Sequence, residues 1–132
     1  MSAAENEAVV RRLYEAMSSG VGLEAVLPLY SADVLLHAPR GTSAVMGVRR
    51  GRDALADAIV VIGAKVTSFE IELLKMFADD EEVISVHRDI GTHRDGRTLN
   101  LRVCCRWIVR DGLISELWEY PEEPSDVDEF FA

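Results

Sequence analysis

His37 closes an apolar run in the stretch VLLHAPRG, which covers Val34 to Gly41. An imidazole titrates near neutral pH, so it can take a proton from a carbon next to a carbonyl and return it elsewhere. Isomerisation, cyclisation and dehydration all use proton transfer of this kind. The alternative is a histidine at the mouth of a cavity that hydrogen-bonds the backbone, and the residue types leave both open.

Two more polar side chains fall on strands that read as apolar on one face. Arg88 carries a planar fork of donors that suits a carboxylate, an enolate or a phosphate. Its alternative role is an internal ion pair with Glu116 or with the acidic C-terminal tail. Tyr120 can donate a hydrogen bond to a developing oxyanion, with Trp118 as a pocket wall. Both aromatic residues are equally compatible with a plain core.

The elements that must position these residues begin with helices. A capping-box pair, Ser2 and Glu5, precedes apolar residues at helical spacing, which predicts a first helix that ends at residues 18–20. A short second helix at 22–30, a strand at 33–38 and a loop at 39–51 follow. Asp53 then opens a third helix.

From residue 69 onward the hydrophobic period changes to two. The predicted strands are 69–78, 83–93, 98–110 and 113–120. Helices followed by an antiparallel meander are typical of an α+β fold, in which the helices cover one face of a curved sheet.

Two Arg-Asp-Gly links, at 94–96 and 110–112, predict hairpins and allow the strand register to be tested. With two-residue turns, Arg88 pairs with Val103, and Val103 with Tyr120. One face then collects most of the apolar residues, including Cys105, Trp107, Trp118 and Tyr120. The other face carries His87 and Asp89, with Asp89 between Glu72 and Arg102 of the neighbouring strands, which is interpreted as a cross-strand ion pair or a dimer contact. A bulge would exchange the faces and bring His87 and Asp89 into the pocket.

Composition excludes several classes of partner. The net charge of −9 over 132 residues disfavours nucleic acid and anionic membranes. No apolar run approaches the roughly 20 residues of a membrane span, and the acidic N-terminus does not resemble a signal peptide. Cys104 and Cys105 are neighbours that point to opposite faces of a strand, so no bridge is expected between them. We expect a cytoplasmic protein without metal or other cofactor, since no Cys/His ligand spacing occurs.

The segments LYSADVLLHAPRG, GVRRGRDAL, HRDGRTLN and VRDGLISELWEY, in this order, resemble the nuclear transport factor two-like superfamily. Within it, the chain is most similar to SnoaL-like, ketosteroid-isomerase-related proteins. The resemblance covers nearly the whole chain and implies one domain over residues 1–132, with an acidic tail at 121–132. It implies a cone-shaped, mixed and mostly antiparallel sheet round an internal apolar pocket for a small molecule, and homodimers formed through the outer sheet face. Isomerases, polyketide cyclases, epoxide hydrolases, dehydratases and binders share this fold.

The catalytic positions of the isomerases are not kept. Their first-helix tyrosine falls on Leu13, one position from Tyr14. Their aspartate base falls on Ala38, beside His37, and their second oxyanion donor falls on Cys105.

Of the catalytic residues of limonene epoxide hydrolases, only the arginine is kept, and it falls on Arg88. Their two aspartates fall on Ile90 and Tyr120. Glu116 is then the one carboxylate clearly placed on the apolar face.

We therefore predict a cofactor-independent acid–base enzyme of the isomerase, cyclase or dehydratase type, acting on a small, apolar, oxygenated substrate. The predicted catalytic residues are His37, Arg88 and Tyr120. The residues predicted to bind substrate are Trp118, Tyr14, Cys105, Glu116 and Trp107. The alternatives are a non-catalytic small-molecule binder of the same fold and an epoxide hydrolase with a rearranged water-activating set.

Overall fold

A computed structural model describes residues 1–18 and 22–132 and confirms the α+β architecture. The helices are α1 (Ala3–Ser18), α2 (Leu23–Val26), the 3-10 turn η1 (Leu27–Leu29), α3 (Arg52–Lys65) and α4 (Pro124–Phe130). The strands are β1 (Tyr30–His37), β2 (Val48–Arg50), β3 (Val66–Ala78), β4 (Glu82–His93), β5 (Thr98–Arg110) and β6 (Leu113–Pro121). The short strand β2 lies in the segment that was predicted to be a loop.

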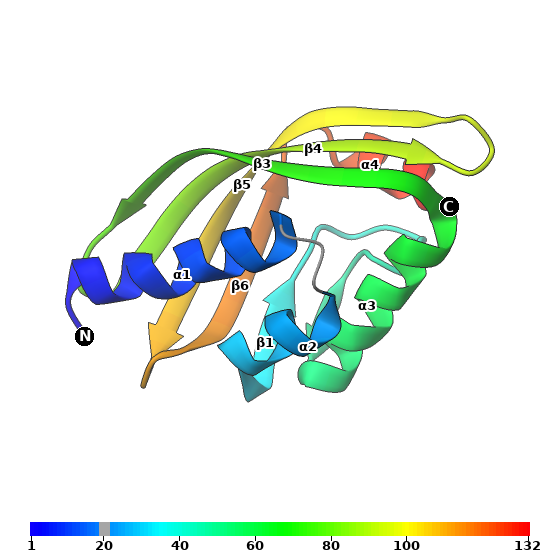
Figure 1. The fold of residues 1–132 in the computed structure, drawn as a ribbon. Coiled ribbons are helices and arrows are strands. Elements are labelled where there is room, and N and C mark those ends of the chain that lie inside the picture. Colours follow the sequence, from blue (N-terminus) through cyan, green and yellow to red (C-terminus); the bar gives the residue numbers. More distant parts are fainter. Residues whose placement is uncertain (19–21) are drawn as a thin grey trace.

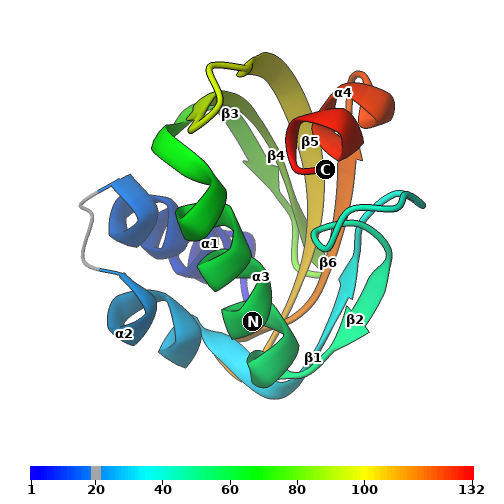
Figure 2. The ribbon, with the colours of Figure 1, turned by 90° about the vertical axis from the view of Figure 1, so that its right-hand side faces the viewer.

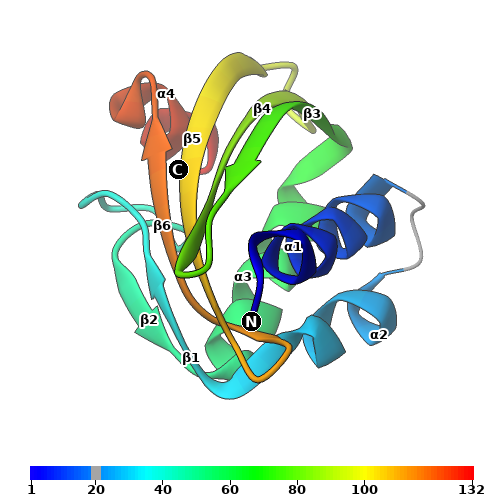
Figure 3. The same cartoon turned by 90° about the vertical axis from the view of Figure 1, so that its left-hand side faces the viewer.

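The six strands form one mixed sheet in the order β2-β1-β6-β5-β4-β3. Strands β1 and β6 pair in parallel, and every other neighbouring pair is antiparallel. The sheet curves so that α1, α2 and α3 lie on its concave side (Figures 1 and 2). Helix α4 lies at one end, beside β5 and β6, as the opposite view also shows (Figure 3).

Helix α1 forms because its start is capped and one of its faces is apolar. The Ser2 hydroxyl accepts a hydrogen bond from the Glu5 backbone, and the Glu5 carboxylate accepts one from the Ser2 backbone, which confirms the capping box. Val10 and Leu13 are completely buried against the sheet. Among the described residues, no helix is long and apolar enough to cross a membrane.

The β4–β5 hairpin differs from the prediction by one residue. Its turn has three residues, Arg94-Asp95-Gly96. The His93 N–H donates to the Arg97 carbonyl, the His93 carbonyl accepts from the Gly96 N–H, and Gly96 has a φ of 97°. His87 therefore pairs with Val103, and Arg88 pairs with Arg102. Because side chains alternate along a strand, this single step turns the whole of β4 over.

The β5–β6 hairpin has the predicted two-residue turn, with Asp111 and Gly112 both at positive φ. A bulge at Ser115 then shifts the register, so that Cys105 pairs with Glu119 instead of Trp118. A second bulge in β3, at Leu74, places Leu73 opposite His87.

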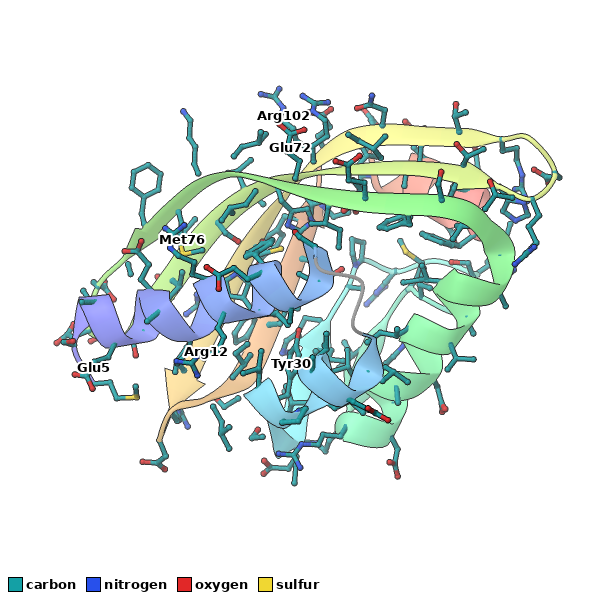
Figure 4. The ribbon with its side chains drawn as sticks, in the orientation of Figure 1. Glu5, Arg12, Tyr30, Glu72, Met76 and Arg102 are labelled. Carbon is teal, nitrogen blue, oxygen red and sulfur yellow. The ribbon has the colours of Figure 1, made fainter. Side chains whose placement is uncertain are left out.

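These shifts correct the predicted faces of β4 and β6. Ser85, His87, Asp89, Leu117 and Glu119 point to the concave side. The convex side carries Phe77, Ile84, Arg88, Glu116, Trp118 and Tyr120, which were all predicted to face inward. Glu72 and Arg102 project from that same convex face (Figure 4). The face predicted for β5 is confirmed, since Cys105 and Trp107 are 1% and 2% exposed.

The C-terminal segment is packed against the body. Phe130 and Phe131 are each 3% exposed and belong to the core. Phe130 lies against Gly91 of β4, where the absence of a side chain leaves room for its ring. The Asp128 carboxylate accepts hydrogen bonds from the backbone of Thr42 and Ser43, which ties α4 to the loop between β1 and β2.

Candidate functional site

The three residues predicted to be catalytic lie on the convex face, outside the cone. His37 stacks on Trp118 at 4.4 Å between ring centroids, and its Nε2 lies 3.6 Å from Glu116. Arg88 donates a hydrogen bond to Asn100, and Tyr120 is 53% exposed. Their predicted place in the pocket is therefore wrong. For Arg88 and Tyr120 it depended on the hairpin register, and for His37 on the family resemblance, whereas His37 pairs with Trp118 on the convex side. Their part in catalysis stays a prediction.

Tyr14 of α1 reaches the concave side of the sheet, together with Cys105 and Trp107, as predicted. Its hydroxyl lies 2.7 Å from Nδ1 of His87 and 2.8 Å from Oγ of Ser85. The Trp107 indole donates to the same Ser85 oxygen at 2.8 Å. Burial raises the pKa of Tyr14 far above its usual value, so the phenol keeps its proton.

The protons of this chain can be placed in more than one way. An indole N–H only donates, so Ser85 accepts from Trp107, whereas either hydroxyl can donate in the contact between Ser85 and Tyr14. When Tyr14 donates to Nδ1 of His87, the ring proton of the neutral imidazole lies on Nε2. This tautomer directs an N–H from His87 toward Asp89.

Asp89 follows His87 by two residues, so both side chains point to the concave side. Its Oδ1 lies 3.1 Å from Nε2 of His87, and the two side chains are 16% and 10% exposed. The contact has the distance of an ion pair without the alignment of a hydrogen bond, so buried Oδ1 has no hydrogen-bond partner in the described part of the chain. It can therefore accept a proton or a hydrogen bond from a bound molecule.

Glu119 faces this group from β6. Burial, and then the charge of Asp89, raise its pKa to about 7, while His87 and Arg49 act in the opposite direction. At neutral pH a large share of this carboxyl therefore carries its proton. The concave side thus contains one carboxyl poised to donate a proton, opposite another that contacts an imidazole.

Water reaches part of this concave surface. Leu36, Leu55, Ile59 and Ile62 pack against the core but stay partly exposed, and no residue of α3 is fully buried. Two hollows of about 400 and 200 Å³ open elsewhere, one beside Glu82 and Arg106 and the other beside Arg50 and Glu116. The enclosed apolar pocket that the resemblance implies stays a prediction.

No group of three or more His, Cys, Asp or Glu side chains in residues 1–18 and 22–132 is arranged to hold a metal ion. Cys105 is buried, which raises the pKa of its thiol well above the usual value. Within this cluster, the groups suited to exchange protons are the His87 imidazole and the carboxyls of Asp89 and Glu119.

The sequence interpretation placed His87 and Asp89 on the outer face and did not consider Glu119 as a site residue. A signal was present, since Ser85, His87 and Asp89 alternate along β4 and so share one face of the strand. The second signal was Gly96, because three-residue hairpin loops commonly end in a residue with positive φ, a conformation that glycine adopts easily. Together they would have moved these side chains to the concave face.

A curved mixed sheet with helices on its concave side, and polar groups between them, defines a class of α+β cone proteins. The chain belongs to the SnoaL-like domain family, whose model matches residues 10–117. Among curated proteins, none matches the sequence.

Solved structures share the fold over almost the whole chain. Bal32a, from a soil-derived mobile gene cassette, is 27% identical, with a TM-score of 0.88 and 98% of each chain covered. An NTF2-like protein of unknown function from Burkholderia pseudomallei is 18% identical, with a TM-score of 0.85 over 97% of this chain and 98% of its own. TerC, co-crystallised with polyporic acid, is 16% identical, with a TM-score of 0.84 over 96% and 98%.

Proposed function

We propose that the protein is a cofactor-independent acid–base enzyme that transfers protons on a small, oxygenated, largely apolar substrate, as an isomerase, cyclase or dehydratase does. One observation carries the proposal. Tyr14 is hydrogen-bonded to His87, whose Nε2 lies 3.1 Å from Asp89 on the concave side, and burial raises the pKa of the neighbouring Glu119 to about 7. Two carboxyls with different environments and a shared space are the usual basis of paired acid and base catalysis.

The roles follow from the proton positions. The Oδ1 atom of Asp89 takes a proton from the carbon next to a carbonyl, while Nε2 of His87 lies 3.1 Å from this oxygen and holds it in place. Glu119 donates its proton to the carbonyl oxygen as negative charge develops there. Tyr14 holds the His87 ring in one orientation and one tautomer.

The test is hydrogen exchange at the α-carbon of a ketone, because it detects proton abstraction whatever the final product is. With 2-tetralone in D₂O, NMR should show exchange faster than in buffer alone. Glu119→Gln and Asp89→Asn should each slow the enzyme-dependent rate by about 10²- to 10⁴-fold. The matched controls on the convex face, Glu116→Gln and His37→Asn, should leave it unchanged.

The controls also test the hypothesis drawn from the sequence. Loss of exchange in His37→Asn, with an unaffected Asp89→Asn, would place catalysis on the outer face and contradict the proposal. Tight binding of the ketone without exchange in the wild-type protein would support the alternative, a non-catalytic small-molecule binder.

One observation favours a third function, the opening of an epoxide by water. Asp89 Oδ1 has an unused acceptor site that can polarise a water molecule, and Glu119 can protonate the epoxide oxygen. Formation of a diol from cyclohexene oxide, lost in both Asp89→Asn and Glu119→Gln, would select this function over isomerisation.

We further propose that two copies of this single domain associate through the convex face. That face exposes Phe77, Tyr120 and Leu74, which are 64%, 53% and 40% accessible. Large apolar side chains that stay exposed on one face of a sheet support an interface there. A reducing, cytoplasmic location is part of the proposal, supported by the free thiols of Cys104 and Cys105.

A further inference from the structure

Arg49 is the inward-facing residue of β2. It pairs with Leu36 of β1, which packs against the core, and cross-strand partners point to the same side of a sheet. Its neighbours in the strand, Val48 and Arg50, are exposed on the convex side, whereas Arg49 is partly buried. The strand therefore places one guanidinium on the concave side.

This guanidinium has little internal compensation. One of its Nη atoms donates to the carbonyl of Met46 at 3.2 Å. Over residues 1–18 and 22–132, no carboxylate forms an ion pair with it. Several exposed arginines do have one, such as Arg102 with Glu122 and Arg106 with Glu82.

The nearby carboxyls compensate its charge only in part. Asp89 is in contact with His87. Glu119 is close enough for the charge of Arg49 to lower its pKa, yet burial holds that pKa at about 7. A partly buried cation without a partner is costly, and an anion that enters the same space relieves this cost.

We propose that Arg49 binds an anionic oxygen group of the substrate, a carboxylate or an ionised enol, and so selects acidic ligands over their neutral analogues. The guanidinium fork offers two parallel donors to such a group. The anion would lie at the β2 edge of the concave side, with the rest of the molecule extending toward Asp89 and Glu119. The inference deepens the proposed function by naming a substrate class, and it holds equally for a binder without turnover.

The test compares 2-naphthoate with methyl 2-naphthoate, two probes that share a ring system and differ in charge, by titration calorimetry. The wild-type protein should bind the acid at least 10-fold more tightly than the ester. Arg49→Gln should weaken binding of the acid by about 10- to 100-fold, which is the range of one charge-assisted hydrogen-bonded contact, and should leave the ester within a few-fold. Arg49→Lys should retain part of the preference, because it keeps the charge and loses the fork.

The matched control is Arg50→Gln, which removes the same charge from the next residue on the opposite face and should bind both probes as the wild type does. Thermal unfolding shows whether each variant is folded. If Arg49→Gln is not folded, the comparison with the wild type uses Arg49→Lys instead. Equal affinities for acid and ester, equal losses in Arg49→Gln and Arg50→Gln, or a wild-type protein that binds neither probe would overturn the proposal. Failure of ketone exchange alone would reject the proposed enzyme and leave the role of Arg49 standing.

Discussion

The hydroxyl of Tyr14 lies 2.7 Å from Nδ1 of His87, which joins α1 to the middle of the sheet across 73 residues of sequence. The contact is buried and continues to Ser85 and Trp107. It therefore serves the stability of the fold and the orientation of a proposed catalytic group at the same time.

Replacing Tyr14 with phenylalanine should lower the free energy of unfolding by about 1–3 kcal/mol, because Nδ1 of His87 loses its buried partner. Urea unfolding measures the change. Tyr120→Phe is the control, since removal of that exposed hydroxyl should change the free energy of unfolding by less than about 0.5 kcal/mol. Equal stabilities of Tyr14→Phe and the wild-type protein would show that the contact contributes nothing.

Glu119 should make stability depend on pH in a defined direction. Its pKa rises from 4.5 to about 7 on folding, so the folded protein binds the proton more tightly than the unfolded chain does. The stability this provides is present below pH 4.5 and is lost as pH rises toward 7, by about 3 kcal/mol at most. Glu119→Gln should therefore gain stability over the wild type as pH increases. If the free energies of unfolding of the two proteins changed equally between pH 4.5 and about 7, the proposed pKa shift would be refuted.

Asp128 should act in the opposite direction. Backbone hydrogen bonds from Thr42 and Ser43 lower the pKa of its carboxyl, so its contribution is present above the usual aspartate pKa and is lost as pH falls through the lowered value. Asp128→Asn should lower Tm at neutral pH, and the difference from the wild type should shrink in acid. Asp57→Asn, an exposed change on α3, is the control. A Tm difference that is constant with pH would show that the charge is not involved.

Association through the convex face should depend on Phe77. Phe77→Lys places a charge on the proposed interface, on the edge strand β3, and should raise the dimer dissociation constant at least 10-fold, as light scattering after gel filtration would show. Val60→Lys is matched in exposure, at 59% against 64%, but lies on α3 and should have no effect. A wild-type protein that is monomeric at all concentrations would end this proposal.

Gly91 should not accept a side chain. A Cβ there would lie 2.9 Å from the Phe69 ring and 3.0 Å from the Phe130 ring, so Gly91→Ala should cost about 1–3 kcal/mol by overpacking. Gly63 in α3 has no atom within 4 Å of such a Cβ. Gly63→Ala should instead stabilise the helix by about 0.5–1 kcal/mol. Equal effects of the two changes would contradict the close approach.

The sequence predicted the elements better than the faces. The strands at 83–93 and 98–110 match the structure within one residue, and the inward face of β5 is right because its polar and apolar residues alternate cleanly. Strand β4 carries Ile84, Val86 and Ile90 on its convex side, so its apolar residues do not identify the buried face. A turn of three residues rather than two then decided the orientation of His87 and Arg88.

The candidate site was predictable only in part. Tyr14, Cys105 and Trp107 were identified from helical spacing and from the register of β5, which does not depend on the turns. His87, Asp89 and Glu119 depend on a hairpin loop and on a bulge at Ser115, both local backbone choices that hydrophobic patterns do not encode. Arg49 lies on a strand of three residues, too short to show a period.

The parallel pairing of β1 with β6 also sets an order of events in folding. Residues 35–37 must find partners at 116–118, so this seam closes a long loop, whereas the β3–β4, β4–β5 and β5–β6 hairpins form from neighbouring segments. Arg49 and Glu119 lie on opposite sides of the seam. Arg49 and Glu119 therefore come together only after β1 has paired with β6, which we expect to be the slowest step. A ligand that contacts both residues would bind the fully folded protein and not a partly folded one.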